Sequence, residues 1–438
     1  MGSSPTQQVA LAVIAVSLAV GVFFLFRGMP RTAVAVWVAV MFFTPVWLGA
    51  TVQGFNITAL IAVTLIAMLA WSASGLHWSF VDSLVLILAV AVALAVVIGG
   101  SDPAHAQEFV LMWMLPYAWG RLILARVSRE FLAACIAIAA AIAAVLAIAE
   151  FLTGDNIFLS IPGASSSVWG GQRQRAGLIR VEGAFGHSIA LGGSLAMSIV
   201  FVMVLKWAVW LRTALIVLLG TAAALTFSRL GLVGVALTIA LMVVLLHRVI
   251  GKALSVTISI ALGVGAVAAL PTLLQVFGDA GAEAEGSAEY RGDLLPLVNT
   301  MNVLGVSPAR ERLPTGEDYW GGFRSIDSAL ILLGLQFGLI PLALSLVLIG
   351  VLIVATLRRP SPPAIALLAQ VPAFATVALI TQYSAFTWFV AGLAVAWRGA
   401  EGDDSVGRGR GGSVAAEHGD RALRGGHPPL AAAETSPR

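Results

Sequence analysis

Apolar stretches recur along the chain from Val9 to Trp397, separated by short polar breaks. Most stretches have about 17 to 25 residues, the length that an α-helix needs to cross the hydrocarbon of a bilayer. The pattern predicts an all-α, polytopic membrane protein with about 12 to 13 transmembrane helices. The composition agrees, because 59% of the residues are hydrophobic, 11% are charged and the mean hydropathy is +0.96. No soluble domain has such a composition.

Lysine and arginine fall in alternate breaks between these stretches. Loops rich in the two residues stay on the cytoplasmic side of a membrane, so their positions predict an orientation. With the N-terminus outside, the following residues are all cytoplasmic: Arg27, Arg31, Arg121, Arg126, Arg129, Lys206, Arg212, Arg248, Lys252, Arg358, Arg359 and Arg398. The breaks at residues 50–56 and 99–106 carry neither lysine nor arginine, as the rule requires of outside loops.

Two longer polar connections divide the chain into segments. The segments are N-terminal transmembrane helices (1–153), a basic extracytoplasmic loop (154–185), central transmembrane helices (186–270), a large extracytoplasmic loop (271–325), C-terminal transmembrane helices (326–397) and a tail (398–438). The tail is rich in glycine, alanine and proline, which predicts a disordered cytoplasmic segment. Its six arginines match six acids, so no basic patch favours nucleic acid.

The basic loop is an exception to the charge rule. It carries Arg173, Arg175 and Arg180, and only Asp155 provides an acid before Glu182. The planar fork of an arginine fits phosphate oxygens, so this loop is a candidate anion site. The alternative is a solvated loop whose arginines have no ligand, because the rule is a statistical bias.

A further arginine lies inside the apolar stretch 213–246, which is too long for one span. The residues TFSRLG at 226–231 predict two helices joined by a tight turn on the outside face. Arg229 then lies at the outer interface, beside the arginine-bearing loops. The alternative is that its side chain snorkels to lipid headgroups.

The large loop is acidic, with eight acids against four arginines and a formal balance of −4. The apolar spacing from Glu289 to Asn302 predicts a short helix on the membrane surface. The single cysteine, Cys135, excludes an intrachain disulfide and a Cys-rich metal site. We expect neither a metal ion nor a cofactor.

Four segments together carry a family resemblance: RVEGAFGHSIALGGSLA after the basic loop, TFSRLGLVG at the helix turn, YRGDLL in the large loop and SIDSALILLGLQFGLIPLAL after it. In this order they resemble the O-antigen ligase and polymerase superfamily of bacterial envelope proteins, over Arg173 to Leu344. The resemblance implies an inverting, metal-independent glycosyltransferase of the bacterial cytoplasmic (inner) membrane. It would transfer a glycan from a polyprenyl diphosphate to an acceptor hydroxyl on the extracytoplasmic side.

The resemblance also implies residue roles. Arg180, Arg229 and Arg291 match family arginines that would hold the diphosphate and stabilise its charge as the glycosidic bond breaks. Arg173 and Arg175 are further candidates for diphosphate binding. The implied partners are the lipid-linked donor, a glycan or glycolipid acceptor, membrane lipids and, as a candidate, a chain-length regulator.

The chain departs from the family in one respect. O-antigen ligases carry a histidine late in the large loop, whereas this chain has none between His247 and His418. This favours a polymerase or another acceptor over a lipopolysaccharide ligase. Since transfer needs a group that takes the acceptor's proton, we predict Asp327 for this role, with Glu182 and His187 as rivals.

Each of these assignments has a structural alternative. Asp327 and His187 suit the N-terminal ends of helices, where they would cap free N–H groups. Glu182 is also a candidate ion-pair partner of Arg180. Tyr290 and Trp320 are candidates for stacking on sugars, although interfacial aromatic residues are expected in any membrane protein. At the level of function, the alternative is a transporter or flippase of lipid-linked sugars.

Overall fold

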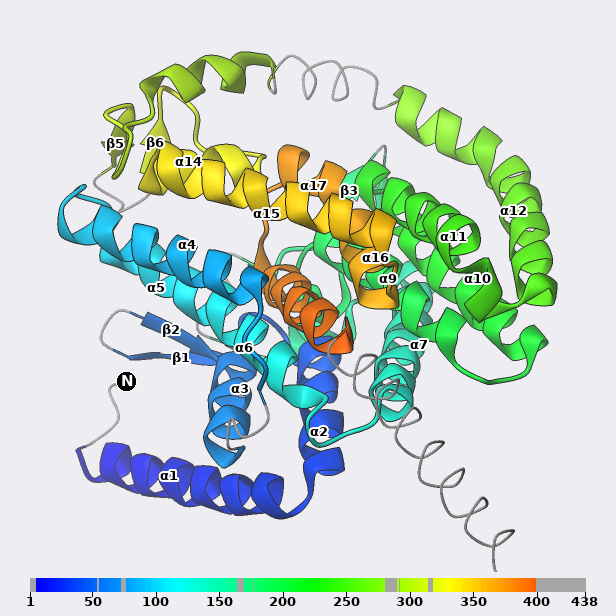
Figure 1. The fold of residues 1–438 in the computed structure, drawn as a ribbon, viewed down its shortest axis with the longest axis horizontal. Helices are drawn as coiled ribbons and strands as arrows, with labels where there is room; N and C mark the ends of the chain where they lie inside the picture. The colour runs from blue at the N-terminus through cyan, green and yellow to red at the C-terminus, as the bar shows by residue number, and fades with distance from the viewer. Residues whose placement is uncertain are drawn as a thin grey trace, which may run out of the picture.

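The computed structural model describes residues 5–52, 55–71, 76–163, 169–175, 177–279, 290, 292–313 and 318–398. Over these residues the fold is helical, as predicted (Figure 1). The described strands form three antiparallel hairpins: β1 (Gly49–Val52) with β2 (Phe55–Thr58), β3 (Gln174–Arg175) with β4 (Leu178–Ile179), and β5 (Arg310–Arg312) with β6 (Asp318–Trp320). Arg291 and the tail after Arg398 lie outside the described residues.

Four described helices are long and apolar enough to cross a membrane, judged by length and composition: α4 (Phe80–Val97), α7 (Arg129–Thr153), α11 (Arg229–Ile250) and α15 (Leu339–Arg358). The remaining helices are α1 (Pro5–Gly28), α2 (Pro30–Phe43), α3 (Ala59–Ala70), α5 (Pro103–Phe109), α6 (Leu115–Ile123), α9 (Ser188–Val204), α10 (Val209–Leu225), α12 (Lys252–Asp279), α14 (Ala329–Phe337), α16 (Pro362–Leu368), α17 (Val371–Thr376) and a last described helix over 381–398. Shorter turns are the π-helical η1 (Val110–Met114) and the 3₁₀ turns η2 (Ile157–Ser160), η3 (Gly183–Phe185) and η4 (Leu295–Thr300). The total of about 12 to 13 spans stays a prediction based on segment length.

Polar residues and glycines determine where the helices begin and end. Ser128 begins α7, because its side chain accepts a hydrogen bond from the N–H of Phe131. Gly154 ends the same helix with a φ of 80°, a left-handed conformation that favours glycine. This end coincides with the predicted start of the basic loop.

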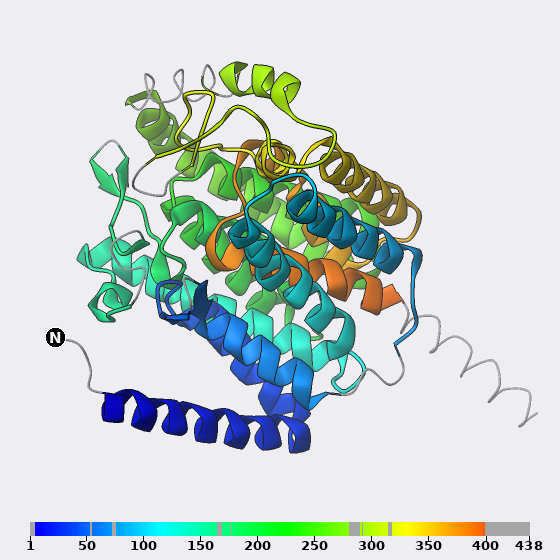
Figure 2. The same cartoon turned by 90° about the vertical axis from the view of Figure 1, so that its left-hand side faces the viewer.

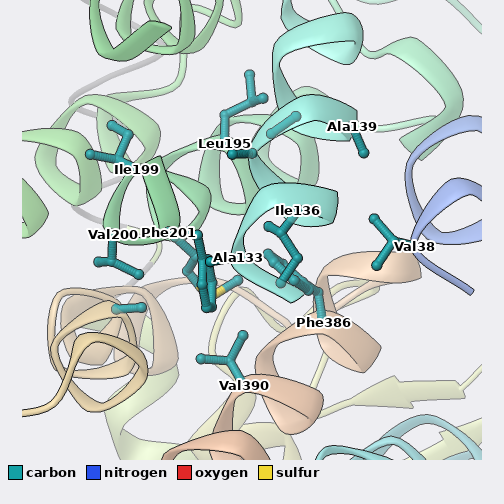
Figure 3. Packing of buried hydrophobic residues seen from close by; sticks show 14 of the residues in the cluster. Val38, Ala133, Ile136, Ala139, Leu195, Ile199, Val200, Phe201, Phe386 and Val390 are labelled. Atoms are coloured by element: carbon teal, nitrogen blue, oxygen red, sulfur yellow. The ribbon is translucent and has the colours of Figure 1, made fainter. Parts of the chain in front are cut away.

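Helix α9 lies at the centre of the molecule, since 15 of its 17 residues are buried. It contacts α7, α10, α11 and α16. Figure 3 shows side chains of α2, α7, α9 and the last described helix meeting in this core. Small residues permit the close packing, because Gly192 of α9 lies directly against Gly231 of α11.

Outer helices expose apolar side chains. Helix α1 runs along one edge of the molecule, where it contacts α2 and α3 (Figure 2). Leu18 and Phe24 of α1 are 67% and 65% exposed, and Val354 of α15 is 49% exposed. Such apolar faces suit contact with lipid, so the described fold is compatible with a helical membrane protein.

The basic breaks gather at one end of the bundle. The Lys206 ammonium lies 2.6 Å from a Glu130 carboxylate oxygen. The Arg129 guanidinium donates to the carbonyl of Trp397 at 2.9 Å. Helix α7 begins at this end with Arg129 and enters the basic loop after Thr153 at its other end. The basic loop and the basic breaks therefore lie at opposite ends of α7.

Two boundaries differ from the sequence prediction. The stretch after Asp327, predicted as one span, is two helices, because Gly338 has a φ of 100° between α14 and α15. The large loop packs against the junction between α14 and α15, where the N–H groups of Leu339 and Ile340 donate to carbonyls of the loop. Helix α12 continues through Pro271 to Asp279, so the loop leaves the helix later than predicted.

Candidate functional site

The predicted turn between the two halves of the stretch 213–246 is confirmed. Helix α10 ends at Leu225 and α11 begins at Arg229. Ser228 caps α11 through a hydrogen bond from the N–H of Gly231 to its side chain at 3.2 Å. Phe227 has a φ of 45°, which makes the reversal possible within three residues. The turn presents the carbonyl groups of Thr226 and Phe227 to the basic loop.

The three arginines of the basic loop converge on this turn and on the start of α9. Arg175 donates to the carbonyl of Phe227 at 2.8 Å, and Arg180 donates to that of Thr226 at 3.1 Å. Arg173 donates to the carbonyl of Gly186 at 3.0 Å. We call Arg173, Arg175 and Arg180 the arginine cluster. Arg229 is exposed and follows directly after the turn that the cluster contacts.

The N-termini of α9 and α11 lie beside one another at the cluster. Gly192, the fifth residue of α9, contacts Gly231, the third residue of α11. A helix N-terminus presents free N–H groups and the positive end of the helix dipole. Two such ends and the arginine cluster together make this region suited to an anion.

Glu150 organises the cluster and was not predicted from the sequence. Its side chain is 4% exposed near the end of the apolar helix α7. One carboxylate oxygen accepts the N–H of Glu182 at 3.1 Å, and the other accepts that of Gly183 at 2.9 Å. The carbonyl of Gly183 accepts from the Asn156 amide at 3.1 Å. The signal in the sequence is a single acid inside an apolar run, which is costly and therefore commonly has a specific partner or function.

Glu182 lies inside the cluster and is 2% exposed. One of its oxygens lies 3.2 Å from the guanidinium of Arg173, so the predicted ion pair exists but with Arg173 instead of Arg180. Burial raises the pKa of Glu182 to about 7, although the neighbouring Arg173 acts in the opposite direction. Such a carboxyl changes its charge near neutral pH.

His187 is the N-cap of α9, as its structural alternative predicts. Its Nδ1 accepts the N–H of Ile189 at 3.2 Å, which fixes this nitrogen as an acceptor. Burial, together with the positive charges of Arg173 and Arg180, lowers the pKa of His187 to about 3. The neutral ring is therefore a weak proton acceptor and a poor candidate for the catalytic base.

Asp327 lies apart from the cluster. Its side chain is exposed and accepts a hydrogen bond from Ser325 at 3.3 Å. The cap of α14 is Ser328, so the capping alternative for Asp327 is not what the structure shows. Burial raises the pKa of the Tyr290 phenol, and the nearby negative charge of Asp327 adds to this shift.

A short connecting segment separates Asp327 from the cluster. The N–H of Ala329 donates to the carbonyl of Val377 at 2.9 Å. Five residues further along, the Gln382 amide donates to the carbonyl of Ala184 at 3.3 Å, beside Glu182. Asp327 and the arginine cluster therefore flank the segment 377–382.

The aromatic residues of the large loop mostly contribute to packing. Trp320 is 3% exposed and packs with Leu294, Leu297 and Met301, so its ring contributes to the core of the large loop and its sugar-stacking role stays a prediction. In place of the short helix predicted on the membrane surface between Glu289 and Asn302, residues 295–300 form the 3₁₀ turn η4, which packs on α14. The Tyr290 ring is half-buried and contacts Phe323 edge to face.

Among the described residues, no group of three or more histidine, cysteine, aspartate or glutamate side chains is placed to hold a metal ion. The all-α fold, with four described helices long and apolar enough to cross a membrane, is that expected of a helical membrane protein. In comparisons with protein-family models, curated proteins and solved structures, no match to this chain is found.

Proposed function

We propose that this protein transfers a glycan from a polyprenyl-diphosphate carrier to an acceptor hydroxyl, as a polysaccharide ligase or polymerase. The observation that supports this most strongly is the convergence of Arg173, Arg175 and Arg180 on the N-termini of α9 and α11. Guanidinium groups and helix N-termini both bind phosphate well, the first by bidentate hydrogen bonds and the second by free N–H groups. The charge distribution further favours the extracytoplasmic face of the bacterial cytoplasmic membrane for this site.

In the proposed reaction the acceptor oxygen attacks the anomeric carbon while the bond from that carbon to the diphosphate breaks. The anomeric configuration inverts, and the lipid diphosphate leaves with the bonding electrons. The arginine cluster and Arg229 stabilise the negative charge that develops on the leaving group, so the reaction proceeds without a metal ion. Arg291 keeps its proposed role in the large loop.

The acceptor's proton passes to a carboxylate. Asp327 is our first candidate, because its carboxylate is exposed and a substrate can reach it. Glu182 is the second, because its pKa is raised by burial to about 7, the range in which a general base works well. Its 2% exposure and its ion pair with Arg173 favour a role in orienting that arginine instead.

The test is a transfer assay with purified full-length protein in lipid nanodiscs and a labelled polyprenyl-diphosphate oligosaccharide. Arg229→Ala and Arg248→Ala form a matched pair, because the two exposed arginines lie near opposite ends of α11. We expect wild type and Arg248→Ala to release lipid diphosphate, and Arg229→Ala to lose at least about 100-fold in rate at unchanged thermal stability.

Two further results discriminate between the candidates. Asp327→Asn should abolish transfer while donor binding persists, whereas Glu182→Gln should retain some activity if Glu182 only orients Arg173. No donor consumption by the wild type, together with movement of labelled lipid-linked sugar between vesicle leaflets, would show a transporter or flippase instead.

A further inference from the structure

Two cavities adjoin one another beside α14, and neither is lined by a residue of the arginine cluster. The larger has a volume of about 150 Å³ and lies between α4, α14, α15, α16 and the last described helix, with almost entirely apolar walls. The smaller, of about 60 Å³, has a mixed polar and aromatic lining. Both are lined by Trp113, Ala329, Leu333 and Leu379. We call the pair the amphipathic cavity.

The polar end of the amphipathic cavity contains Glu108, His105 and Gln336. Glu108 is exposed, and among the described residues it has no hydrogen-bond or ion-pair partner. Glu108 is the sixth residue of α5, which continues into the apolar η1, so its carboxylate lies where polar and apolar surroundings meet and lines the cavity as a hydrogen-bond acceptor. The His105 ring is held 3.4 Å from Asp318 of β6, so the large loop positions one of the side chains that line this end.

Aromatic rings lie between the polar and the apolar ends. Trp113 stacks on Trp388 with ring centroids 5.1 Å apart, and Phe109 packs on Trp113 at 5.0 Å. The indole N–H of Trp388 is buried and has no hydrogen-bond partner within the described structure. Rings next to carboxylate and amide groups suit a sugar, which combines apolar C–H faces with hydroxyls.

The charge of the polar end contrasts with that of the arginine cluster. The residues that line the smaller cavity include one acid and no lysine or arginine. A phosphate would therefore meet a carboxylate without a lining cation, whereas hydroxyl groups can donate to Glu108 and Gln336. The occupant that fits is an uncharged, hydroxyl-rich head.

The apolar end suits a lipid chain. Its walls run along the last described helix from Thr387 to Arg398, and the 11 helical steps between these residues correspond to about 16 Å. This is about the thickness of one hydrocarbon leaflet. Three alanines on different helices, Ala355, Ala364 and Ala394, line the apolar end of the cavity, where larger side chains would fill the space.

We propose that the amphipathic cavity binds a glycolipid, with a neutral sugar head at Glu108 and Gln336 and its lipid tail between α4, α15 and the last described helix. Its role as the acceptor rests on the proposed transferase function. Ala329, which both cavities share, lies two residues from Asp327, so a sugar at the polar end is close in sequence and space to the candidate proton acceptor.

The test measures retention of radiolabelled monoglucosyl diacylglycerol by the purified full-length protein in detergent, with no donor present. Unlabelled phosphatidylglycerol and diacylglycerol serve as competitors that lack the sugar. Two matched pairs of variants isolate the site: Glu108→Gln with Glu311→Gln, an exposed acid of β5, and Leu348→Trp with Leu346→Trp, which faces away from the cavity on α15.

We expect Glu108→Gln to weaken retention at least about tenfold, since it replaces a charged hydrogen-bond acceptor. Leu348→Trp should abolish retention, while both control variants bind like wild type and neither competitor displaces the glycolipid. If Leu348→Trp fails to fold, the Glu108 pair alone decides.

Equal competition by phosphatidylglycerol or diacylglycerol, no effect of Glu108→Gln, or no retention by the wild type would each overturn the glycolipid site. Since the donor is absent, the result is independent of the transfer assay. Retention without any transfer would refute the proposed function alone, and transfer without retention would refute this site alone.

Discussion

Arginines of the basic loop and of the large loop bond to different kinds of acceptor. Each contains a short antiparallel hairpin, β3–β4 in the first and β5–β6 in the second. In the basic loop, Arg175 and Arg180 donate to backbone carbonyls. In the large loop, Arg310 lies 2.9 Å from carboxylate oxygens of both Asp102 and Asp318.

The difference shows how neighbours determine what a charged side chain can do. A backbone carbonyl positions a guanidinium without a formal charge of its own, whereas a carboxylate pairs with it. The basic loop brings three guanidinium groups to one helix turn, an arrangement that suits a phosphate. In the large loop, ion pairs hold the β5–β6 hairpin to the start of α5, where Arg312 also lies 3.0 Å from Asp102. The first arrangement suits ligand binding and the second suits docking of the loop.

The largest expected effect separates the two loops directly. Arg180→Ala should lower the transfer rate by about 10²- to 10³-fold, because a positioned charge opposite the leaving group is lost. Its thermal stability in detergent should change little. Arg310→Ala should instead lower the stability by about 2 kcal/mol, because Asp102 and Asp318 lose a shared partner. Equal losses of rate for both variants at matched stability would remove the distinction.

Glu150 should show how far the basic loop depends on one buried acid. Glu150→Ala removes the acceptor of two backbone N–H groups and should lower the free energy of unfolding by about 3 kcal/mol. Glu150→Gln keeps one oxygen and should lose about half as much. Tryptophan-fluorescence unfolding in detergent measures both, with Glu130→Gln at the opposite end of α7 as the control. An unchanged Glu150→Ala protein would show that the loop is held by its arginines alone.

Sequence reasoning found those parts of the site that depend on local pattern. The length of the apolar stretch 213–246 required a turn, and the turn occurs at Thr226 to Ser228. The basic composition of the loop before Glu182 selected the arginines that the structure brings together. Likewise, a histidine directly before an apolar run suggested the cap at His187. Each inference needed only neighbours in the chain.

The missed features depend on contacts between distant segments. Glu150 bonds to residues 32 and 33 positions away, which no periodicity reveals. Trp320 is buried because the large loop folds back onto α14, not because of its own surroundings in sequence. The residues around Gly338 form a continuous apolar stretch in the sequence. The interruption of the helix at Gly338 depends on hydrogen bonds to the distant carbonyls of Asn302 and Val303. These three features depend on which distant segments pack together and not on the residue types nearby in the sequence.

The pH dependence of stability should reveal the burial of Glu182. Its pKa in the folded state, about 7, lies above the ordinary value of 4.5. The neutral form is therefore favoured by folding, so its contribution is complete below about pH 4.5 and is lost as the pH rises toward 7. We expect the wild type to lose about 2 kcal/mol over this window relative to Glu182→Gln, measured by unfolding at a series of pH values. Parallel curves for the two proteins would show that Glu182 is ionised throughout.

The smallest expected effect concerns His187, at the junction of the basic loop and α9. If its role is to cap the helix, His187→Ala should cost about 1 kcal/mol, and His187→Asn should restore most of this because asparagine also accepts the N–H of Ile189. Transfer activity should follow the same order, with Asn close to wild type. A His187→Asn protein that folds normally but transfers no glycan would mean that the other ring nitrogen acts on substrate. The basic loop would then supply chemistry as well as charge, which would make its contrast with the large loop sharper.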